Sequence, residues 1–394
     1  MSTKRLLAAL FILLLPGVAV ACLWDYDTLA MERARFPSAL ELITGKFLRH
    51  SPEFYQWRVA DRLAKLEKDP NNLALLDDLA VAHEKLGHHD KAIEIALKQD
   101  RIQPNRYETL ANLGTFYIHA GQLEKGVEYI DRAIQINSDA HFGREKYQKL
   151  LVEYVLSKQR DGKLQLPLTI TKRDGDRSPQ SFLTYLKKRS DSSNGVPSAD
   201  GRQSAIKGVL GMMKFGHYDS PVLLEALAGL LSYDLTGYDM PQDDAKRLAA
   251  RAYLKASYEV KDGKAKEEYR RLAKEVLEMQ RNGLGDWVAE AQTLEALEPH
   301  FQQELSEARG WYIALQQYEI AWIRDGRNPE EEFDKLYAAD PEMSPSSEGN
   351  PMQTPVVRRF VIGWTAGGVA VVVVFIAAVV WIVRRRRRKA QVTA

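Results

Sequence analysis

Hydrophobic residues recur at the spacing of an α-helix along most of the chain. In the stretch from Glu108 to Gly126, ETLANLGTFYIHAGQLEKG, this period holds on both sides of Gly121, which predicts two short helices joined at that glycine. The same period returns later in five stretches: 203–214, 221–233, 243–260, 264–280 and 286–325. The pattern therefore predicts an all-α protein.

An internal repeat with a period of 34 residues surrounds the first pair of helices. Leu79 aligns with Leu113, Ala80 with Gly114, Gly87 with Gly121, and Ala92 with Gly126. Each unit follows a proline-containing turn, so the clear units are residues 73–106 and 107–140. Two consecutive copies at a fixed spacing indicate a stack of helical hairpins.

These units resemble the tetratricopeptide repeat family, and the chain as a whole is similar to bacterial membrane-anchored proteins that carry such repeats. The second unit matches the family pattern at Leu113, Gly114, Tyr117, Gly121, Gly126, Ile130 and Ala133. The first unit departs from it with His83 at the aromatic position. The resemblance implies a helical-hairpin solenoid of at least about three units. We expect this array to cover residues 22–157, with incomplete units at 52–70 and 141–156.

The resemblance also explains Gly114, which lies inside a predicted helix where glycine costs about 1 kcal/mol relative to alanine. In this family the Leu-Gly pair, here Leu113 and Gly114, marks a close crossing between helices. A side chain at that point would hold the helices apart, and Ala80 takes the same place in the first unit.

Members of the family bind partners on the concave face, which is formed by the first helix of each unit. Carried over position by position, the partner-binding groove consists of Asp77, Val81, Glu84, Lys85, Glu108, Asn112, Thr115, Ile118 and His119. Some relatives clamp the terminal carboxylate of a peptide with lysines and asparagines, and of those positions only Asn112 is matched here. The mixed acidic and apolar lining favours a basic or amphipathic segment as the ligand.

The repeats are followed by segments of different character. Residues 158–202 are expected to form an irregular linker with a short strand near 163–179. Residues 203–338 are expected to form a second helical domain, with degenerate repeats of the same type as an open alternative, and residues 339–357 a flexible tether rich in Pro, Ser and Gly.

Both ends carry membrane signals. Residues 1–21 combine two early cations, an apolar run and an Ala-x-Ala site, which is typical of a signal peptide. Residues 360–383 are apolar and free of charge over the length of a membrane-spanning helix, and a cluster of six cations follows in the basic tail, 384–394. This arrangement predicts a single-pass protein of the bacterial inner membrane, with its bulk in the periplasm and its tail in the cytoplasm.

Two features near these ends leave alternatives open. Cys22 is the only cysteine, and it is either the first residue after cleavage, which we favour, or the acylated residue of a lipoprotein. Gly363 and Gly367 form a G-x-x-x-G pattern, which is typical of dimerising membrane helices but also occurs in single spans. A homodimer is therefore an open hypothesis.

Charge and motifs exclude several classes of function. Ten of the 55 Lys and Arg residues lie at the two ends and all 53 acids lie between them, so the exported part carries a net charge of −8 and no basic stripe for nucleic acid. No nucleotide-binding or nucleophile motif is present in the sequence. The stretch from His83 to His89 fails the HExxH spacing because position 87 is glycine. We therefore predict no catalytic, cofactor or metal site.

The sequence favours a non-enzymatic scaffold that binds a peptide or protein partner through the repeat groove. The alternative hypothesis is an enzyme or ligand-binding module in residues 202–338, with the repeats as its docking arm. The identity of the partner does not follow from the sequence.

Overall fold

The computed structural model describes residues 23–26, 36–137, 144–170, 181–189, 199–232, 242–278 and 293–339, all of which belong to one unit of the chain. Helices dominate this part, and its β-pairing is limited to isolated bridge residues such as Arg160 and Lys163, so the all-α prediction is confirmed there. The helices are α3 (Ala39–Thr44), α4 (Pro52–Leu66), α5 (Leu73–Lys85), α6 (His89–Ile102), α7 (Tyr107–His119), α8 (Leu123–Ile136), α9 (Arg144–Lys158), α10 (Phe182–Arg189), α11 (Ala199–Phe215), α12 (Pro221–Leu231), α13 (Gln242–Glu259), α14 (Gly263–Glu278), α15 (Leu294–Arg324) and α16 (Pro329–Ala339).

Several sequence predictions concern residues outside the described part. These are the signal peptide at 1–21, Cys22, the tether from 340 onward, the span at 360–383 with Gly363 and Gly367, and the basic tail. Among the helices that are described, none is both long enough and apolar enough to cross a membrane.

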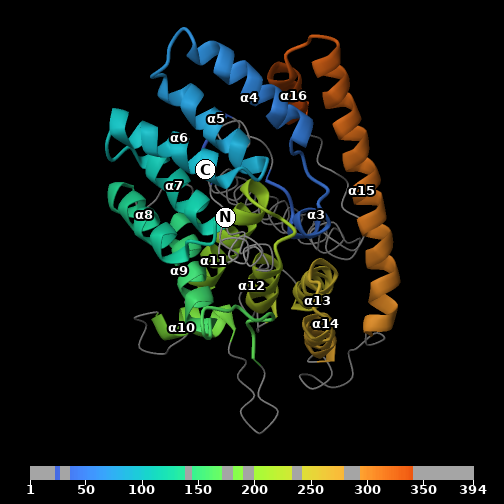
Figure 1. Ribbon diagram of the computed structural model, residues 1–394. Coiled ribbons are helices and arrows are strands. Elements are labelled where there is room, and N and C mark those ends of the chain that lie inside the picture. The colour runs from blue at the N-terminus through green and yellow to red at the C-terminus, as the bar shows by residue number, and fades with distance from the viewer. Residues whose placement is uncertain are drawn as a thin grey trace, which may run out of the picture. The chain divides into compact units, whose positions relative to one another are not determined.

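The two repeat units form successive helical hairpins, α5–α6 and α7–α8, which lie side by side in Figure 1. Both hairpins turn at a glycine with a left-handed backbone, Gly87 and Gly121, each with φ of +77°. Such a backbone disfavours any residue with a Cβ atom. The next N–H in each turn, from His88 or Gln122, donates to a carbonyl five residues earlier and ends the helix in the same way. Local sequence therefore determines the hairpins.

Helices α7 and α8 cross at two facing glycines, Gly114 and Gly126. A Cβ atom on Gly114 would lie 2.5 Å from Ile130 Cδ1, and one on Gly126 would lie 2.5 Å from Ile118 Cγ1. Real Cβ contacts are not that short, so neither position accepts a side chain without displacement of the helices. The close crossing expected at Gly114 is present.

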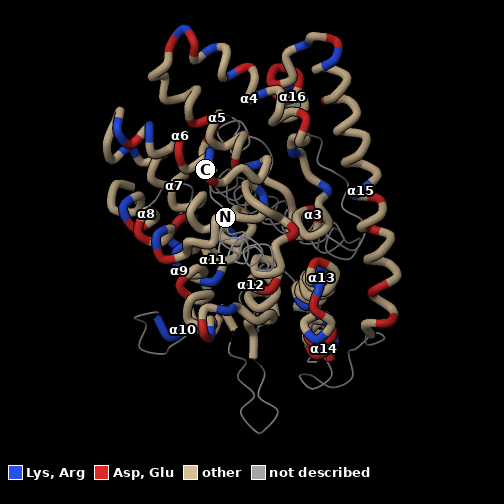
Figure 2. Tube along the Cα trace, in the orientation of Figure 1, with Lys and Arg blue, Asp and Glu red and all other residues tan. Residues whose placement is uncertain are grey.

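One hydrophobic core continues from the repeats into the rest of the described chain. It joins Ile118, Leu123 and Ile130 of the second repeat to α9 and to α11 through α14. Helix α12 is buried along its whole length and carries only one charged residue, Glu225, so it is almost entirely tan in Figure 2. The boundaries expected near residues 157 and 203 are therefore not breaks in the core.

The expected linker is attached to this core rather than separate from it. The carboxylate of Glu225 accepts hydrogen bonds from the backbone N–H groups of Leu168 (3.0 Å) and Thr169 (2.5 Å) and from the hydroxyl of Tyr269 (2.7 Å). Burial raises the pKa of Glu225, although these hydrogen bonds oppose the shift. In the described part of 163–179, residues 163–170, no continuous strand forms, and the N–H groups of Leu168 and Thr169 pair with a side chain rather than with another strand.

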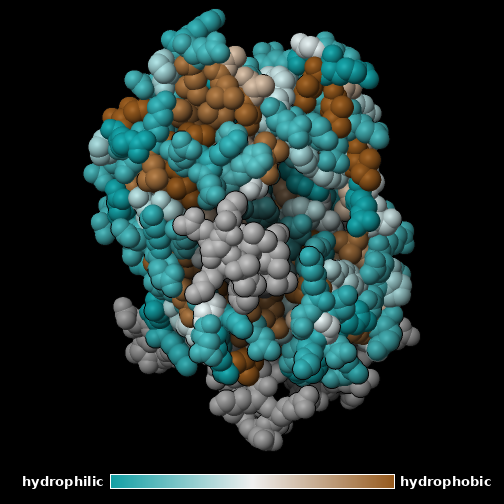
Figure 3. Space-filling view, viewed as in Figure 1, coloured by the Kyte–Doolittle hydropathy of each residue, from teal (hydrophilic) through white to brown (hydrophobic). Residues whose placement is uncertain are grey.

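Helix α15 runs along one side of the helical stack and returns the chain to its beginning (Figure 1). Its 31 residues span about 46 Å. Near its start Glu298 pairs with Arg270 of α14, and near its end Glu319 contacts His50, just before α4. Its outer face carries exposed Ile313, Tyr318 and Ile320, and brown surface follows the helix in Figure 3. Helix α16 then packs beside α4.

Candidate functional site

The predicted groove residues lie on α5 and α7 or directly at their ends, and most of them are covered. Asp77, Val81, Glu84, Asn112, Thr115 and Ile118 are each at most 3% exposed. The side chain of His119 is 2% exposed, whereas Lys85 and Glu108 are half-buried. The structure thus places these nine residues together on two adjacent helices, but other parts of the same chain occupy the surface they form.

The first cover is the segment of residues 23–26. The side-chain amide of Asn112 accepts a hydrogen bond from the backbone N–H of Trp24 (2.8 Å) and donates one to the backbone carbonyl of Trp24 (3.0 Å). Leu23 is buried against Val81, Phe116 and their neighbours in the repeat core. The groove therefore binds main-chain groups, and in this structure those groups belong to the protein itself.

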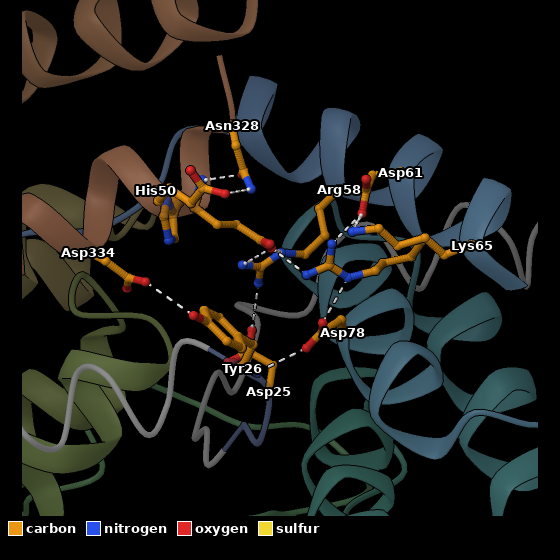
Figure 4. A network of polar contacts seen from close by, with 12 residues as sticks. Asp25, Tyr26, His50, Arg58, Asp61, Lys65, Asp78, Asn328 and Asp334 are labelled. Atoms are coloured by element: carbon orange, nitrogen blue, oxygen red, sulfur yellow. Dashed lines mark hydrogen bonds and ion pairs between the residues drawn. The ribbon is translucent and has the colours of Figure 1, made fainter. Parts of the chain in front are cut away.

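A buried ionic network attaches the same segment to three helices (Figure 4). Arg58 of α4 contacts Asp25 at 3.1 Å and donates from Nε to Glu330 of α16 at 2.9 Å. Arg62, one turn later, donates to Asp78 of α5 at 2.8 Å and also pairs with Glu330. Burial opposes the charge of Arg62, but Asp78 and Glu330 raise its pKa above the ordinary value.

Tyr26 extends the network at its exposed edge. Its backbone N–H donates to Asp78 at 2.9 Å, and its hydroxyl donates to Asp334 of α16 at 3.1 Å. Both arginines of α4 are buried, and a buried cation is stable only when acids surround it. Segment 23–26, α4, α5 and α16 consequently depend on one another for charge balance.

The second cover is the chain between α11 and α12. The ammonium of Lys85 donates to the carbonyls of Phe215 (2.8 Å) and Gly216 (3.2 Å), at the C-terminal end of α11 where unpaired carbonyls favour a cation. A hollow of about 350 Å³ remains between the two covers, lined among others by Leu23, Asp25, Arg49, Lys85 and Tyr218.

Other predicted groove residues contact neighbours inside the array. Thr115 accepts a hydrogen bond from Gln148 of α9 at 3.1 Å. Asp77 pairs with Arg106 at 2.6 Å and accepts from Gln99 at 2.7 Å, which joins the two repeats. Glu108 lies 3.3 Å from Arg106 at the rim.

A cluster of one carboxylate and two imidazoles lies where three helix ends meet. His119 Nδ1, at the end of α7, is 2.5 Å from Glu84 Oε1, and His89 Nδ1, at the start of α6, is 2.9 Å from Glu84 Oε2. Burial opposes ionisation of Glu84, but the hydrogen bonds from His119 and His89 lower its pKa to about 2. The ring of His217 lies 5.1 Å from that of His119, and burial lowers its pKa to about 3. The repeat pattern assigns Glu84 and His119 to the groove, but nothing in the sequence indicates that His89 and His217 lie beside them.

A separate cleft of about 790 Å³ lies between α9, α10 and the start of α14. Its lining contains five cationic side chains, Lys158, Arg160, Lys163, Lys188 and Lys264, and one acid, Glu268. Burial lowers the pKa of Lys158, and the cations of Lys188 and Arg160 add to the shift, although Glu225 opposes it. The cleft suits an anionic group.

Comparison with known proteins agrees with the hairpin geometry. Residues 107–139, which comprise α7 and α8, match the family model of the tetratricopeptide repeat. The chain carries a tetratricopeptide repeat. Tetratricopeptide repeats are protein-interaction modules, so a module of this class is present. No curated protein is significantly similar to the chain.

Two parts of the site were absent from the sequence prediction. Segment 23–26 follows the predicted signal peptide directly, and its sequence LWDY has no repeat period that would assign it to the groove. The arginines of α4 lie in residues 52–70, which the sequence assigns to an incomplete repeat unit, and their spacing of four residues is the local signal that they share a face.

Proposed function

We propose that the protein is a non-enzymatic scaffold, anchored in the bacterial inner membrane with its bulk in the periplasm, whose tetratricopeptide groove holds a short segment of a partner protein. The observation that carries the proposal is the double hydrogen bond between Asn112 and the backbone of Trp24. An amide that binds both main-chain groups of one residue can hold a peptide of any sequence, while the surrounding pockets select its side chains.

Segment 23–26 occupies the place that the partner segment would take. Because it is part of the same chain, it competes as an intramolecular ligand at high effective concentration. A partner therefore has to displace the segment. The apparent affinity of the partner equals its affinity for the open groove multiplied by the fraction of molecules in which the groove is open. In this proposal the segment keeps the groove closed until a partner of sufficient affinity is present.

Site-specific photo-crosslinking of the full-length protein in its native membrane tests the groove. The crosslinking residue replaces Lys85 or Glu108 at the half-buried rim, and a control replaces Tyr318 on α15, which is 65% exposed. We expect adducts with a partner at the rim, and a higher yield when Trp24→Ala weakens the competing segment. Adducts at Tyr318 alone, or a yield that Trp24→Ala does not change, would contradict the proposal.

The membrane anchor rests on the sequence of residues 360–383 and has its own test. Removal of residues 358–394 is expected to release the protein from the membrane fraction into the soluble periplasmic fraction. Retention in the membrane would point to acylated Cys22 instead, which an intact-mass measurement of the mature N-terminus detects.

Dimerisation through the span is a further part of the proposal. The variant Gly363→Ile plus Gly367→Ile is expected to lower the yield of crosslinked dimer, because larger side chains prevent close approach of two helices. An unchanged yield would remove the dimer from the proposal.

The basic cleft supports a second candidate, a ligand-binding module for an anionic group. The experiment is a comparison of Lys158→Gln plus Lys188→Gln with the wild type for binding of small anionic ligands to the full-length protein. Binding that depends on these lysines, together with a rim that yields no adducts, would favour this second function over the scaffold.

A further inference from the structure

The cluster of Glu84, His89 and His119 has the composition of a metal site. We infer that these three side chains bind one divalent transition-metal ion, and that zinc is the ion they fit best. This site is separate from the main-chain contacts of Asn112, and the inference goes beyond the proposed scaffold function.

The ligand atoms are already close enough to share an ion. One atom from each residue lies within 4.8 Å of the other two. A tetrahedral zinc ion with bonds of about 2.0–2.1 Å separates its ligand atoms by roughly 3.3 Å. The contacts between Glu84 and the two imidazoles, at 2.5 Å and 2.9 Å, therefore have to open by less than about 1 Å, which side-chain rotation can supply.

The donor set favours zinc over the hard cations. Two imidazole nitrogens and one carboxylate oxygen suit zinc and its neighbours in the transition series, whereas calcium and magnesium require mostly oxygen ligands. Three protein ligands leave one tetrahedral position, which a water molecule can fill; the ring of His217, whose centroid is 5.1 Å from that of His119, lies beside the cluster.

Two of the three side chains are buried and one is partly open to solvent. The side chains of Glu84 and His119 are 1% and 2% exposed, and His89, at 33%, provides the side open to solvent. The Nε2 atom of His119 is buried and has no hydrogen-bond partner, so this nitrogen can carry either the proton or the lone pair while Nδ1 faces Glu84. The nearby ammonium of Lys85 donates to the carbonyls of Phe215 and Gly216. Its positive charge is therefore directed toward the end of α11 and not toward the three ligand side chains.

A metal here would connect three helix ends. Glu84 lies at the end of α5, His89 at the start of α6 and His119 at the end of α7, so one ion would join both hairpins at the rim of the groove. An ion that binds only the folded state stabilises it by mass action. The expected role is therefore structural.

The test uses the full-length protein in detergent, purified with an affinity tag that contains no histidine and stripped with a chelator. Zinc is added back and measured as bound metal per chain, cobalt is added as a spectroscopic probe, and thermal unfolding is followed with and without zinc. We expect one ion per chain, the visible absorption of tetrahedral cobalt, and a higher Tm with zinc.

Matched variants locate the ligands. Glu84→Gln, His119→Gln and His89→Gln should each lower zinc affinity by at least about tenfold. His88→Gln is the control, because His88 is adjacent in sequence but contacts His83 rather than Glu84. His89→Gln keeps the test valid if the two buried variants fail to fold. No zinc uptake by the wild type, equal affinity in all variants, or a loss only in His88→Gln would overturn the inference.

Discussion

Asn112 binds the backbone of Trp24 through both atoms of its side-chain amide, across 88 residues of sequence. An intramolecular contact of this kind makes the concave face of the repeat part of the folded core. The same contact is the feature that a partner would have to imitate.

Loss of this contact should loosen segment 23–26 without unfolding the repeats. In Asn112→Ala two part-buried main-chain groups of Trp24 lose their hydrogen bonds to the amide, which costs about 1–3 kcal/mol. Hydrogen exchange followed by mass spectrometry should show faster exchange in peptides that contain Trp24. Gln317→Ala, on the exposed face of α15, is the control and should leave that exchange unchanged.

The crossing of α7 and α8 should not accept a side chain. Gly114→Leu is expected to lower the free energy of unfolding by about 1–3 kcal/mol through overpacking against Ile130 and Gly126. Gly310→Leu is the matched control, because nothing lies within 4 Å of the corresponding Cβ position. This control should be neutral or slightly stabilising, since glycine is a poor helix residue. Equal melting temperatures of the two variants would refute the packing account of Gly114.

The buried arginines of α4 should be far more sensitive than surface arginines. Arg58→Met removes the cation that Asp25 and Glu330 share, so that Glu330 keeps only Arg62. Removal of one partner from a buried ion pair costs about 3–5 kcal/mol. The surface control is Arg324→Met, whose side chain is 74% exposed. It should change stability by less than about 0.5 kcal/mol in urea unfolding. A loss of similar size in both variants would contradict the role given to the network.

The pairing of α15 with α14 should depend on pH. Hydrogen bonds from Arg270 lower the pKa of Glu298 below its ordinary value of 4.5, with Tyr258 adding to the shift against a smaller effect of burial. A lowered pKa in the folded state gives stability that is present above pH 4.5 and is lost as the pH falls through the lowered value.

Glu298→Gln should therefore lower stability at pH 7 by about 0.5–1 kcal/mol, a value limited by partial exposure of the pair. The difference from the wild type should shrink as the pH falls below 4.5 and through the lowered pKa of Glu298, as measured by urea unfolding at pH 7 and at a series of acidic pH values. Glu278→Gln, from an exposed pair with Lys274, should show no such dependence. A deficit of Glu298→Gln that persists in acid would argue against the ionic origin.

Features with local causes could be predicted from the sequence. The left-handed glycines at 87 and 121 terminate helices through their own backbone, so the hairpins and their period follow from residues a few positions apart. The close packing at Gly114 could be predicted because the repeat pattern places a second helix, α8, against the helix that contains this glycine. Each of these predictions depends on a short stretch of chain.

Features that depend on distant contacts could not be predicted in this way. Nothing near Asn112 indicates that Trp24 will bind it, and nothing near Arg58 indicates Glu330, which lies 272 residues away. The residues assigned to a partner surface lie together on α5 and α7, but the segments that cover them have no repeat period of their own. The cluster of Glu84, His89 and His119 likewise arises only when three helix ends meet.

The return of α15 and α16 to α4 has a consequence for the order of folding. In an open solenoid each repeat needs only its neighbours, so folding can advance from the N-terminus as the chain emerges. Here Arg58 and Arg62 are neutralised by Glu330, and Glu319 binds His50, so the first helices stay incomplete until the last ones have been synthesised. Closure over so long a loop makes the final step slow relative to formation of the hairpins. The helices at the start of the array therefore reach their final packing only when α15 and α16 have docked on them.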